Sequence, residues 1–406
     1  MSVSFWQRAD SADPAAYDVV IVGGGLVGCA TAYWLHRRRS RLRVAIVEAH
    51  SVGHGASGRN AGFLLQGTDT DYLTALDRYG LRRAKHFWRF TRDNRDLIEA
   101  ELQGAAFDFT ACGSMTVAGT EAEDARLQEA VSPLRAIGAP VVYLSPKETN
   151  RRLRARGFWG SLFVTSGAMV NPLNLVQQVA AESRAHVFEY QPVQRVTAAG
   201  DHYRVETDGR QMQTRQVVFA LNAHLPQVLP ALAAYVRPVR AQMLATAPTD
   251  RHLRLPAYTH AGAFYIRQGP GGEVLLGGAR YRHAEAEVGY ADATTPAVQN
   301  DLERYLHAHF PWAQGLDVTQ RWSGTMGFSP DGLPVVGAVP GQPGNVWAAG
   351  FTGHGMSCGF RMGQLLAARV LGDARPDGYE LFAAARFNRP EAEDTRAFEA
   401  ISDPPP

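Results

Sequence analysis

The sequence predicts a chain of mixed class, α/β plus α+β, and three observations point to it. Residues 18–48 read as a buried strand, a glycine turn, a helix and a second strand, which is the order expected around a parallel sheet. A second glycine-rich turn, GFTGHGMS at 350–357, opens another apolar helix near the C-terminus. Between them, AFYIRQGPGGEVLLGG at 263–278 reads as a hairpin around Gly269–Gly272, so strands of a different kind lie between the two turns.

Composition places the chain among ordinary globular proteins. It has 406 residues, of which 45% are hydrophobic and 20% charged, with a net charge of +2 and a pI of about 8.4. That balance gives no reason to expect nucleic acid or a membrane surface as a partner. No apolar run spans a bilayer, the N-terminus resembles no secretory signal, and Cys29, Cys112 and Cys358 suggest neither a disulfide framework nor a metal site. We therefore expect a cytoplasmic protein without a membrane span.

The first segment, DVVIVGGGLVGCATAYWLHRRRSRLRVAIVE, carries a phosphate-binding pattern. Gly23, Gly25 and Gly28 fit the GxGxxG of a Rossmann-like dinucleotide-binding fold. The first glycine allows the tight turn, the second admits a pyrophosphate, and the third lets the helix pack closely on the strand. The helix starts at Leu26 and Val27, where free N–H groups and a positive dipole should face the phosphates.

An acidic residue completes this pattern. Glu48, followed by Ala49, ends the second predicted strand twenty positions after Gly28. A carboxylate there can accept hydrogen bonds from a ribose and disfavours a 2′-phosphate. NADP is therefore the first cofactor to be excluded, and NAD and FAD both remain possible as the bound cofactor.

The stretch GHGASGRNAGFL at 53–64 is predicted to be a loop that another group approaches closely. It holds four glycines in twelve residues and shows neither a helical nor a strand period. Because glycine has no side chain, the backbone of such a loop is open to close contact.

Four segments resemble the D-amino-acid oxidase and glycine or sarcosine oxidase type of FAD-dependent oxidoreductase. They are the 18–48 unit, GASGRNAGF at 55–63, the strands and turns of 187–224, and the stretch 327–372. The resemblance implies one bound FAD contacted by both glycine loops, with the helix after the second loop facing the charge that develops on the flavin. The residues that it assigns to FAD are Gly23, Gly25, Leu26, Val27, Gly28, Glu48, Ala49, Ala56, Ser57, Arg59, Asn60, Ala61, Gly62, Val193, Ala220, Gly324, Gly350, Gly353, His354, Gly355 and Met356.

The resemblance also implies the domain organisation. The FAD-binding domain is expected to be discontinuous, formed by 1–80, 150–230 and 325–375. A substrate domain built on a mainly antiparallel sheet would comprise 81–149 and 231–324, and 376–406 would be a C-terminal tail.

In this family an amine or amino acid is oxidised at the carbon next to its nitrogen. Hydride passes to flavin N5, and the resulting imine is hydrolysed by water. The cofactor performs the difficult step, so no acid–base pair is required of the protein, and the protein's task is to orient the substrate.

Five residues are candidates for the substrate side of the site. Tyr265 matches a tyrosine that flanks the substrate in sarcosine-type relatives, and His354 could supply positive charge near the flavin. Arg267 and Arg280 are candidate carboxylate clamps, because arginine binds carboxylates through two parallel hydrogen bonds. Met326 stands where glycine-oxidase-like relatives have a carboxylate-binding arginine. Either another arginine binds a carboxylate, or the substrate has none at that place.

Three further departures from the family bear on the cofactor and the electron acceptor. Arg59 and Gly324 align with the histidine and cysteine that attach FAD covalently in some relatives, so non-covalent FAD is predicted. Ser357 replaces a lysine that helps oxygen accept electrons, so both O2 and an electron carrier or quinone remain open as acceptors. Asn222 replaces a glycine that is usual beside the cofactor, which leaves the local contact open.

Three classes of function follow. The favoured one is an FAD-dependent amine or amino-acid oxidase or dehydrogenase. The second is an enzyme of the same fold that acts on a 2-hydroxy acid or a modified tRNA base, and the third is a non-catalytic flavin-binding subunit. A tRNA substrate would be expected to leave a basic stripe on the sequence, so no nucleic-acid partner is expected.

Overall fold

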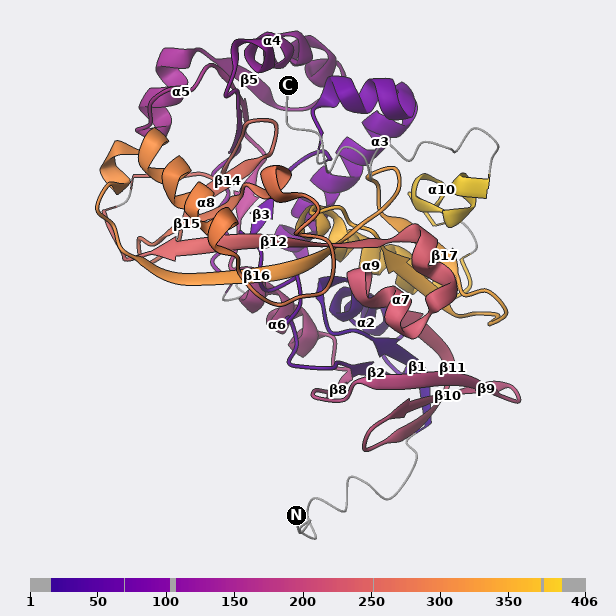
Figure 1. Cartoon of the computed structure of the whole chain (residues 1–406). Coiled ribbons are helices and arrows are strands. Elements are labelled where there is room, and N and C mark those ends of the chain that lie inside the picture. The colour runs from indigo at the N-terminus through magenta and orange to yellow at the C-terminus, as the bar shows by residue number, and fades with distance from the viewer. Residues whose placement is uncertain (1–15, 69, 103–106, 251, 374–375, 389–406) are drawn as a thin grey trace.

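A computed structural model describes residues 16–68, 70–102, 107–250, 252–373 and 376–388. Within these residues the chain forms two eight-stranded sheets, one small strand pair, and helices packed around them (Figure 1). The first sheet is parallel at its centre and the second is almost entirely antiparallel. The predicted class, α/β plus α+β, is therefore confirmed.

The first sheet has a Rossmann-like parallel centre. Its strand order is β17-β18-β11-β1-β2-β8, and β1 pairs in parallel with both β2 and β11. An antiparallel meander of β9 and β10 extends from β11, and β17 is antiparallel to β18. The bounds are β1 (Ala16–Val22), β2 (Val44–Val47), β8 (His186–Phe188), β9 (Val193–Ala199), β10 (His202–Thr207), β11 (Gln211–Phe219), β17 (Val335–Ala338) and β18 (Val346–Ala349).

Strand β1 is an unbroken apolar run because both of its faces are buried. Val19 and Ile21 pack with the helices α2 (Leu26–Arg38), α6 (Pro172–Glu182) and α9 (Gly355–Val370). Val20 and Val22 pack on the opposite face, with the short helices α7 (Leu225–Val228) and η2 (Pro230–Tyr235). A parallel strand covered on both sides has no polar face to show, as the sequence pattern predicted.

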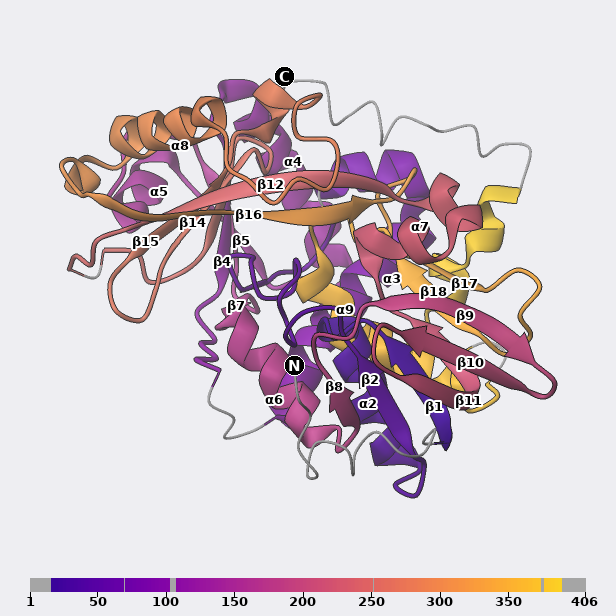
Figure 2. The ribbon, with the colours of Figure 1, turned by 60° about the horizontal axis from the view of Figure 1, so that its bottom comes forward.

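Helices α2 and α9 pack side by side and run in the same direction (Figure 2). A Cβ added to Gly359 would lie 3.0 Å from the side chain of Leu26, and one added to Gly363 would lie 2.4 Å from Cβ of Ala30. The contacts advance together along both helices, so their N-termini lie at the same end of the pair. Gly363 in particular permits a close approach of the two helices that a side chain would prevent.

The second sheet has the order β16-β12-β15-β14-β13-β4-β6-β5, and its one parallel contact among the described strands joins β13 to β4. Its outer face packs on α8 (Pro296–His309), with Leu244, Ile266 and Leu276 buried against Leu302 and Leu306. The bounds are β4 (Ser114–Val117), β5 (Val141–Leu144), β6 (Ser161–Val164), β12 (Arg237–Thr246), β13 (Ala257–Thr259), β14 (Phe264–Gln268), β15 (Val274–Gly278) and β16 (Val318–Phe328).

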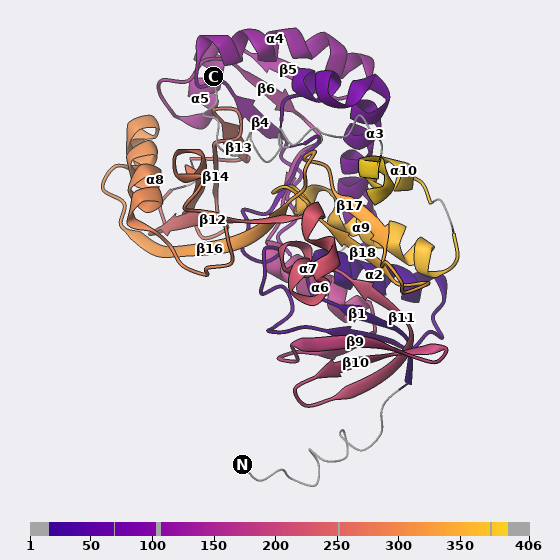
Figure 3. The same ribbon diagram turned by 45° about the vertical axis from the view of Figure 1, so that its right-hand side comes forward.

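The remaining elements are helices and one short strand pair. Helix α3 (Tyr72–Glu101) begins where the Asp71 side chain accepts hydrogen bonds from Leu73 and Thr74, and it is broken at Gly80, where φ is 73°. It lies against α9, as Figure 3 shows. The others are α4 (Glu121–Ala136), α5 (Pro146–Leu153), α10 (Tyr379–Phe382), η1 (Asn222–His224), η3 (Arg280–His283), η4 (Pro311–Ala313), η5 (Ala384–Asn388), and the pair β3 (Phe63–Leu64) and β7 (Ala168–Met169).

The two sheets do not follow the predicted domain ranges at two points. Strand β6 lies within 150–230 but pairs with β4 and β5 in the second sheet. Strand β16 crosses from 231–324 into 325–375. Of the predicted tail, 376–388 form α10 and η5, and residues 389–406 lie outside the described part of the chain.

Candidate functional site

The glycine turn after β1 is built as the GxGxxG pattern requires. A Cβ on Gly23, whose φ is 111°, would lie 2.6 Å from the carbonyl oxygen of Ala220, and a Cβ on Gly28 would lie 2.0 Å from that of Gly23. Both positions therefore exclude any side chain. Gly25 immediately precedes α2, whose first residues are Leu26 and Val27.

Glu48 is anchored to this turn. Its Oε2 accepts a hydrogen bond from the Gly24 N–H at 2.7 Å, and its Oε1 accepts one from the His50 N–H at 2.9 Å. Ala49 is exposed beside it. The carbonyl of Glu48 accepts from Gln191, two residues before Val193, so the start of β9 lies close to the acid. The structure thus brings Glu48 close to the strand that carries Val193, another of the residues assigned to FAD.

The loop 53–62 crosses the N-terminus of α2. The Ser57 hydroxyl accepts a hydrogen bond from the Leu26 N–H at 3.0 Å, and Gly53 donates to the carbonyl of Gly24. Asn60 closes the loop by donating to the carbonyls of Ala56 and Ser57. Its Oδ1 also accepts from the Gly62 N–H at 2.7 Å, beside Ala61. The loop therefore has a fixed shape with its backbone next to the glycine turn.

Arg59 joins this loop to the second sheet. Its guanidinium donates to the carbonyl of Ser323 at 3.0 Å and to Asp292 at 2.7 Å, while its carbonyl accepts from the Trp322 ring N–H. The bond from Arg59 lowers the pKa of Asp292. A Cβ on Gly324 would lie 3.4 Å from Cβ of Arg59. The two positions that carry covalent attachment in some relatives are thus neighbours here.

The second glycine loop, 350–356, lies at the N-terminus of α9. The amides of Gly350 and Phe351 donate to Oδ1 of Asn222, at 3.1 and 3.5 Å. Gly350 and Gly353 have φ values of 70° and 78°, which favour glycine. His354 immediately precedes the helix, which begins with Gly355 and Met356.

The segments that follow the two loops are joined by a hydrogen bond. The hydroxyl of Ser357, in the first turn of α9, accepts a hydrogen bond at 3.0 Å from the Leu65 N–H, just after the first loop. Because α2 and α9 run in parallel, their positive dipole ends lie close together beneath these loops. An anionic or electron-rich ligand is favoured at such a position.

The inner face of the second sheet, opposite α8, closes the site. Directly opposed residues of an antiparallel pair point to the same side, so Tyr258, Tyr265, Gly277, Met243 and Trp322 share one face. Its aromatic residues contact the loops: Tyr265 and Tyr258 pack on Phe63, and Tyr258 stacks on His354 with ring centres 6.0 Å apart. We name this surface the aromatic wall.

The ring of Tyr265 lies over Gly277, which has no side chain. It occupies the place where a side chain on Gly277 would stand, with ring atoms 2.3 Å from that Cβ position. Burial raises the pKa of Tyr265 to about 12, against a smaller lowering by the charge of Arg280. The hydroxyl therefore stays protonated at neutral pH and can act as a hydrogen-bond donor.

Met326 lies on the same face of β16 as Trp322, next to the second loop. Its sulfur is 3.6 Å from the position of a Cβ on Gly353. It also packs against Val239 and Phe328. The position that carries an arginine in glycine-oxidase-like relatives is thus an apolar neighbour of the loop.

The two candidate clamps differ in their surroundings. Arg267 is 4% exposed and donates to the carbonyls of Ala61 and Val170, at 3.0 and 2.7 Å. It therefore fixes the end of the first loop to the sheet. Arg280 is partly buried, and its guanidinium carbon lies 4.8 Å from the ring centre of Phe328.

Several contacts at the site were not predicted. Asn94, buried in α3, donates to the carbonyl of Met356, and Tyr258 forms part of the aromatic wall. Asp292 and Ser323 position Arg59. The alternation of inward and outward residues along a strand could have suggested that Tyr258 faces the site. For Asn94, a polar residue within a long helix, the local sequence gives no sign of its partner.

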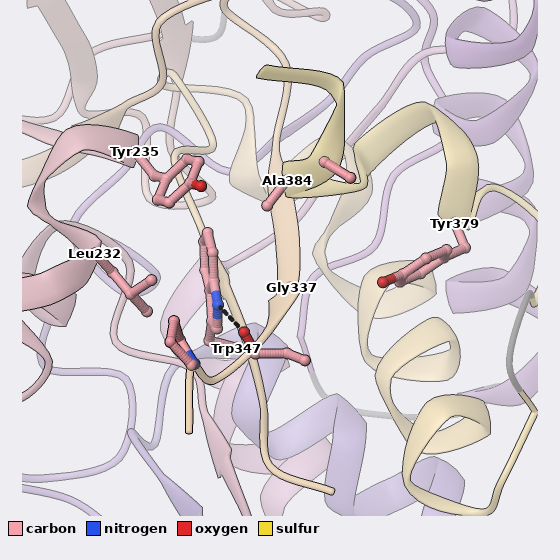
Figure 4. A pocket seen from close by; sticks show the side chains of 9 residues that line it. Leu232, Tyr235, Gly337, Trp347, Tyr379 and Ala384 are labelled. Carbon is pink, nitrogen blue, oxygen red and sulfur yellow. Dashed lines mark hydrogen bonds between the residues drawn. The ribbon is translucent and has the colours of Figure 1, made fainter. Parts of the chain in front are cut away.

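A separate hollow of about 230 Å³ lies between η2, the β17–β18 pair and η5 (Figure 4). Within it the Trp347 ring N–H donates to the carbonyl of Ala338. No charged side chain and no predicted site residue lines it. Its lining residues are Leu232, Tyr235, Gly337, Ala338, Pro340, Trp347, Tyr379, Ala384 and Ala385.

The described residues contain no group of His, Cys, Asp or Glu suited to hold a metal ion. None of their helices combines the length and apolar character that a bilayer crossing needs.

The chain matches a family model described as FAD dependent oxidoreductase (DAO) over residues 18–369. It is 26% identical to gamma-glutamylputrescine oxidoreductase of Escherichia coli K12, covering 90% of this chain and 86% of that protein. It is 27% identical to glycine oxidase of Geobacillus kaustophilus, covering 87% and 93%.

Solved structures show the same fold. The crystal structure of glycine oxidase from Geobacillus kaustophilus superposes with a TM-score of 0.78 at 23% identity, covering 91% of this chain and 99% of that chain. L-proline dehydrogenase from P. horikoshii gives a TM-score of 0.78 at 19% identity, covering 93% and 99%.

Proposed function

Because the chain belongs to the DAO family of FAD-dependent oxidoreductases, we propose that it oxidises a small amine or amino acid at its C–N bond. The single observation that supports this best is that the N-termini of α2 and α9, each beside a glycine loop, lie together in front of the aromatic wall. Relatives named as glycine oxidase and gamma-glutamylputrescine oxidoreductase favour the same substrate class.

The described residues fit FAD. Gly23, Gly25 and Gly28 leave an open turn at the start of α2 for a pyrophosphate, and Glu48 stands beside that turn for a ribose. The loop 350–356 offers backbone N–H groups at the start of α9 for the flavin. When bound, FAD supplies the two-electron oxidation by accepting a hydride from the carbon next to the substrate nitrogen.

The protein contributes orientation and exclusion of water. Tyr258, Tyr265 and Trp322 offer an apolar surface with hydroxyl and ring N–H groups, against which a small amine can be held in front of the loops. The protonated hydroxyl of Tyr265 can donate a hydrogen bond to the substrate. The oxidised amine leaves as an imine, which water hydrolyses to a carbonyl compound.

We further propose that FAD is held without a covalent bond. Arg59 and Gly324 occupy the positions used for attachment in some relatives, and neither can form such a bond. Denaturation followed by filtration should release all flavin from the polypeptide. Flavin that stays with the denatured chain would contradict this proposal.

The electron acceptor is proposed to be a carrier or quinone in preference to O2. Ser357 supplies no positive charge, and its hydroxyl is occupied by the Leu65 N–H. His354, stacked on Tyr258, is the alternative source of charge.

The cytoplasmic location of the protein is also a proposal, which fractionation of cells would test.

The first experiment is anaerobic. The visible spectrum of the FAD-loaded protein is followed while D- and L-amino acids, N-methyl amino acids, polyamines and 2-hydroxy acids are added in turn. Bleaching by an amine or amino acid supports the proposal, and the rate of reoxidation in air measures reactivity with O2. Bleaching only by 2-hydroxy acids, or by none of the compounds, would overturn it in favour of a hydroxy-acid enzyme, a tRNA-modifying enzyme or a non-catalytic subunit.

A further inference from the structure

The charges of helix α3 are arranged against its own stability. Residues 78–92 hold six arginine or lysine residues and no acidic residue, whereas residues 93–101 hold four acidic residues. The helix is broken at Gly80, whose φ of 73° and ψ of 160° are not helical, so a new helical segment starts there. Arg82 and Arg83 lie in its first turn, although the N-terminus of a helix favours acidic side chains. Local helix stability therefore does not account for these basic residues.

Three basic side chains line the outer face of α3. Arg82, Lys85 and Arg89 are exposed and follow one another at steps of three and four residues, which place them on one side of a helix. We name these three residues the basic stripe. Within the part of the chain that the structure describes, no carboxylate pairs with Arg82 or Lys85, and Arg89 lies 3.7 Å from Asp377. The charge of the stripe is thus only partly compensated.

Asp377 compensates little of this charge because several basic groups share it. Its carboxylate lies 2.7 Å from the guanidinium of Arg361 and 3.7 Å from both Arg89 and the His86 ring. Burial lowers the pKa of His86; Asp377 opposes that change, and the charges of Arg89 and Arg361 add to it. This part of α3 therefore carries a net positive charge at neutral pH.

An exposed leucine lies beside the stripe. Leu81 directly precedes Arg82 and is 63% exposed. A small apolar centre with a charged rim is typical of a surface that binds another protein. A lipid surface fits less well, because an interfacial helix inserts its apolar face into the bilayer, whereas the apolar face of α3 packs inward, with Phe87 and Phe90 on Phe382.

The inner face of the same helix contacts the segments around the cofactor site. Thr91 accepts a hydrogen bond at 3.0 Å from the Gly67 N–H, two residues after Leu65, and Asn94 donates to the carbonyl of Met356 at 3.1 Å. Figure 3 shows α3 against α9, the helix that begins at the second glycine loop. Since a helix with its side chains is about 10–12 Å across, one helix separates the basic stripe from these segments.

We infer that the basic stripe and Leu81 form the docking surface for an acidic electron-carrier protein. This inference rests on the proposed function, in which a carrier is one of the acceptors. Each C–N oxidation leaves one hydride on the cofactor, so the carrier gains two electrons per turnover and the proton passes to water. Complexes of electron carriers are weak and bury less than about 1,200 Å², so opposite charges are suited to steer the partner to this helix.

The first test measures binding to the oxidised, FAD-loaded protein, without turnover. The probes are two acidic carriers, a flavodoxin and a plant-type [2Fe–2S] ferredoxin, with cytochrome c as a basic carrier. At about 20 mM salt we expect at least one acidic carrier to bind with a micromolar Kd, which weakens at least about tenfold at about 200 mM salt. Absence of binding by both acidic carriers, or equal binding of cytochrome c, would overturn the inference.

Charge reversal locates the surface. The stripe variant, Arg82→Glu with Lys85→Glu, should weaken binding of the acidic carrier at least about tenfold, and Leu81→Ala about three- to tenfold. The matched control is Arg204→Glu with Arg215→Glu, which reverses two exposed charges on β10 and β11, toward the opposite end of the molecule (Figure 1). Unchanged affinity in the stripe variant, or equal weakening in the control, would contradict the assignment.

Carrier reduction distinguishes a failure of docking from a failure of the proposed function. Under anaerobic conditions, the compound that bleaches the flavin should also reduce the carrier, at a rate that falls at least about tenfold in the stripe variant. Bleaching of the flavin itself should be unchanged in that variant. Bleaching without reduction of either acidic carrier would overturn the inference and leave the proposed function intact, whereas the absence of bleaching by every substrate would overturn the proposed function.

Vesicles test the competing occupant. Phosphatidylglycerol vesicles are compared with phosphatidylcholine vesicles by sedimentation of the unaltered protein and the stripe variant. We expect neither kind to retain the protein at about 150 mM salt. Retention on phosphatidylglycerol that the stripe variant loses, without binding of either acidic carrier, would overturn the inference in favour of a lipid surface.

Discussion

Asn222 is the residue whose departure from the family has the clearest structural effect. Its φ of 45° lies in the left-handed region, where asparagine is tolerated, so it keeps the backbone conformation that glycine would adopt. Its side chain adds something glycine cannot, because Oδ1 accepts from the amides of Gly350 and Phe351. The residue therefore ties the end of the first sheet to the second glycine loop.

The variant Asn222→Gly isolates this contribution, since it removes the side chain without straining the backbone. We expect weaker FAD binding and a loss of about 1–2 kcal/mol in the free energy of unfolding, because two loop amides lose their acceptor. Fluorescence titration with FAD and urea denaturation measure the two effects. FAD affinity equal to that of the unaltered protein would show that the loop keeps its shape without Asn222.

The protonation of His260 should make the free energy of unfolding fall in acid. Burial, aided by the charges of His309 and Arg282, lowers its pKa to about 4, from an ordinary value near 6.5. The unfolded chain therefore binds a proton that the folded chain does not, between those two values. The contribution of neutral His260 is complete above pH 6.5 and is lost as the pH falls toward 4.

His260→Asn tests this, because asparagine also accepts the φ of 51° at this position. Urea denaturation at several pH values should show a shallower decline of the free energy of unfolding between pH 6.5 and 4 in the variant than in the parent protein. Parallel declines would show that other groups cause the acid sensitivity.

At the scale of elements, the α2–α9 pair depends on glycine. Gly363→Ala would place a Cβ 2.4 Å from Cβ of Ala30 and 2.7 Å from the Thr31 nitrogen, which are rigid parts of α2. We expect a loss of about 1–3 kcal/mol in the free energy of unfolding, since the helices must move apart. Weaker FAD binding should accompany it, because both helix N-termini lie at the site.

Gly359→Ala is the matched control in the same helix. Its Cβ would lie 3.0 Å from the end of the flexible Leu26 side chain, which can move. The better helix propensity of alanine, about 1 kcal/mol, should offset much of the cost. Thermal melts of both variants decide the matter: equal destabilisation would contradict the assigned contact at Gly363.

At the scale of the whole molecule, distant parts of the chain supply the cofactor site. The glycine turn contacts the loop 53–62 directly, and the loop 350–356 is linked to them through Leu65 and Ser357, which follow the two loops. FAD that contacts all three should stabilise the entire fold. We expect Tm to rise with FAD concentration, with a gain of about 2.7 kcal/mol at a hundredfold excess over Kd. NAD is the control ligand, and a Tm that ignores FAD would contradict this expectation.

Local patterns predicted the parts of the molecule that local physics determines. The apolar run of β1 and the glycines after it were recognised because burial on both faces and a close backbone approach each leave a direct mark on the sequence. The hairpin around Gly269–Gly272 was confirmed for the same reason.

Contacts between distant segments could not be predicted in this way. Arg267 follows the alternation of its strand, but nothing nearby reveals that its guanidinium binds the carbonyls of Ala61 and Val170. Likewise β6 resembles any short apolar strand, and only its pairing with β4 and β5 assigns it to the second sheet. Such partners are fixed by the folded chain as a whole.

The order of strands in the first sheet has a consequence for synthesis on the ribosome. β1 is made early, but its neighbour β11 begins only at Gln211, and α9 begins much later still, at Gly355. At about 5–20 residues per second, β1 emerges with one edge unpaired for roughly 10–40 s before β11 is translated. The nascent chain must be kept from aggregating during that interval, and the cofactor can be enclosed only when translation is nearly complete.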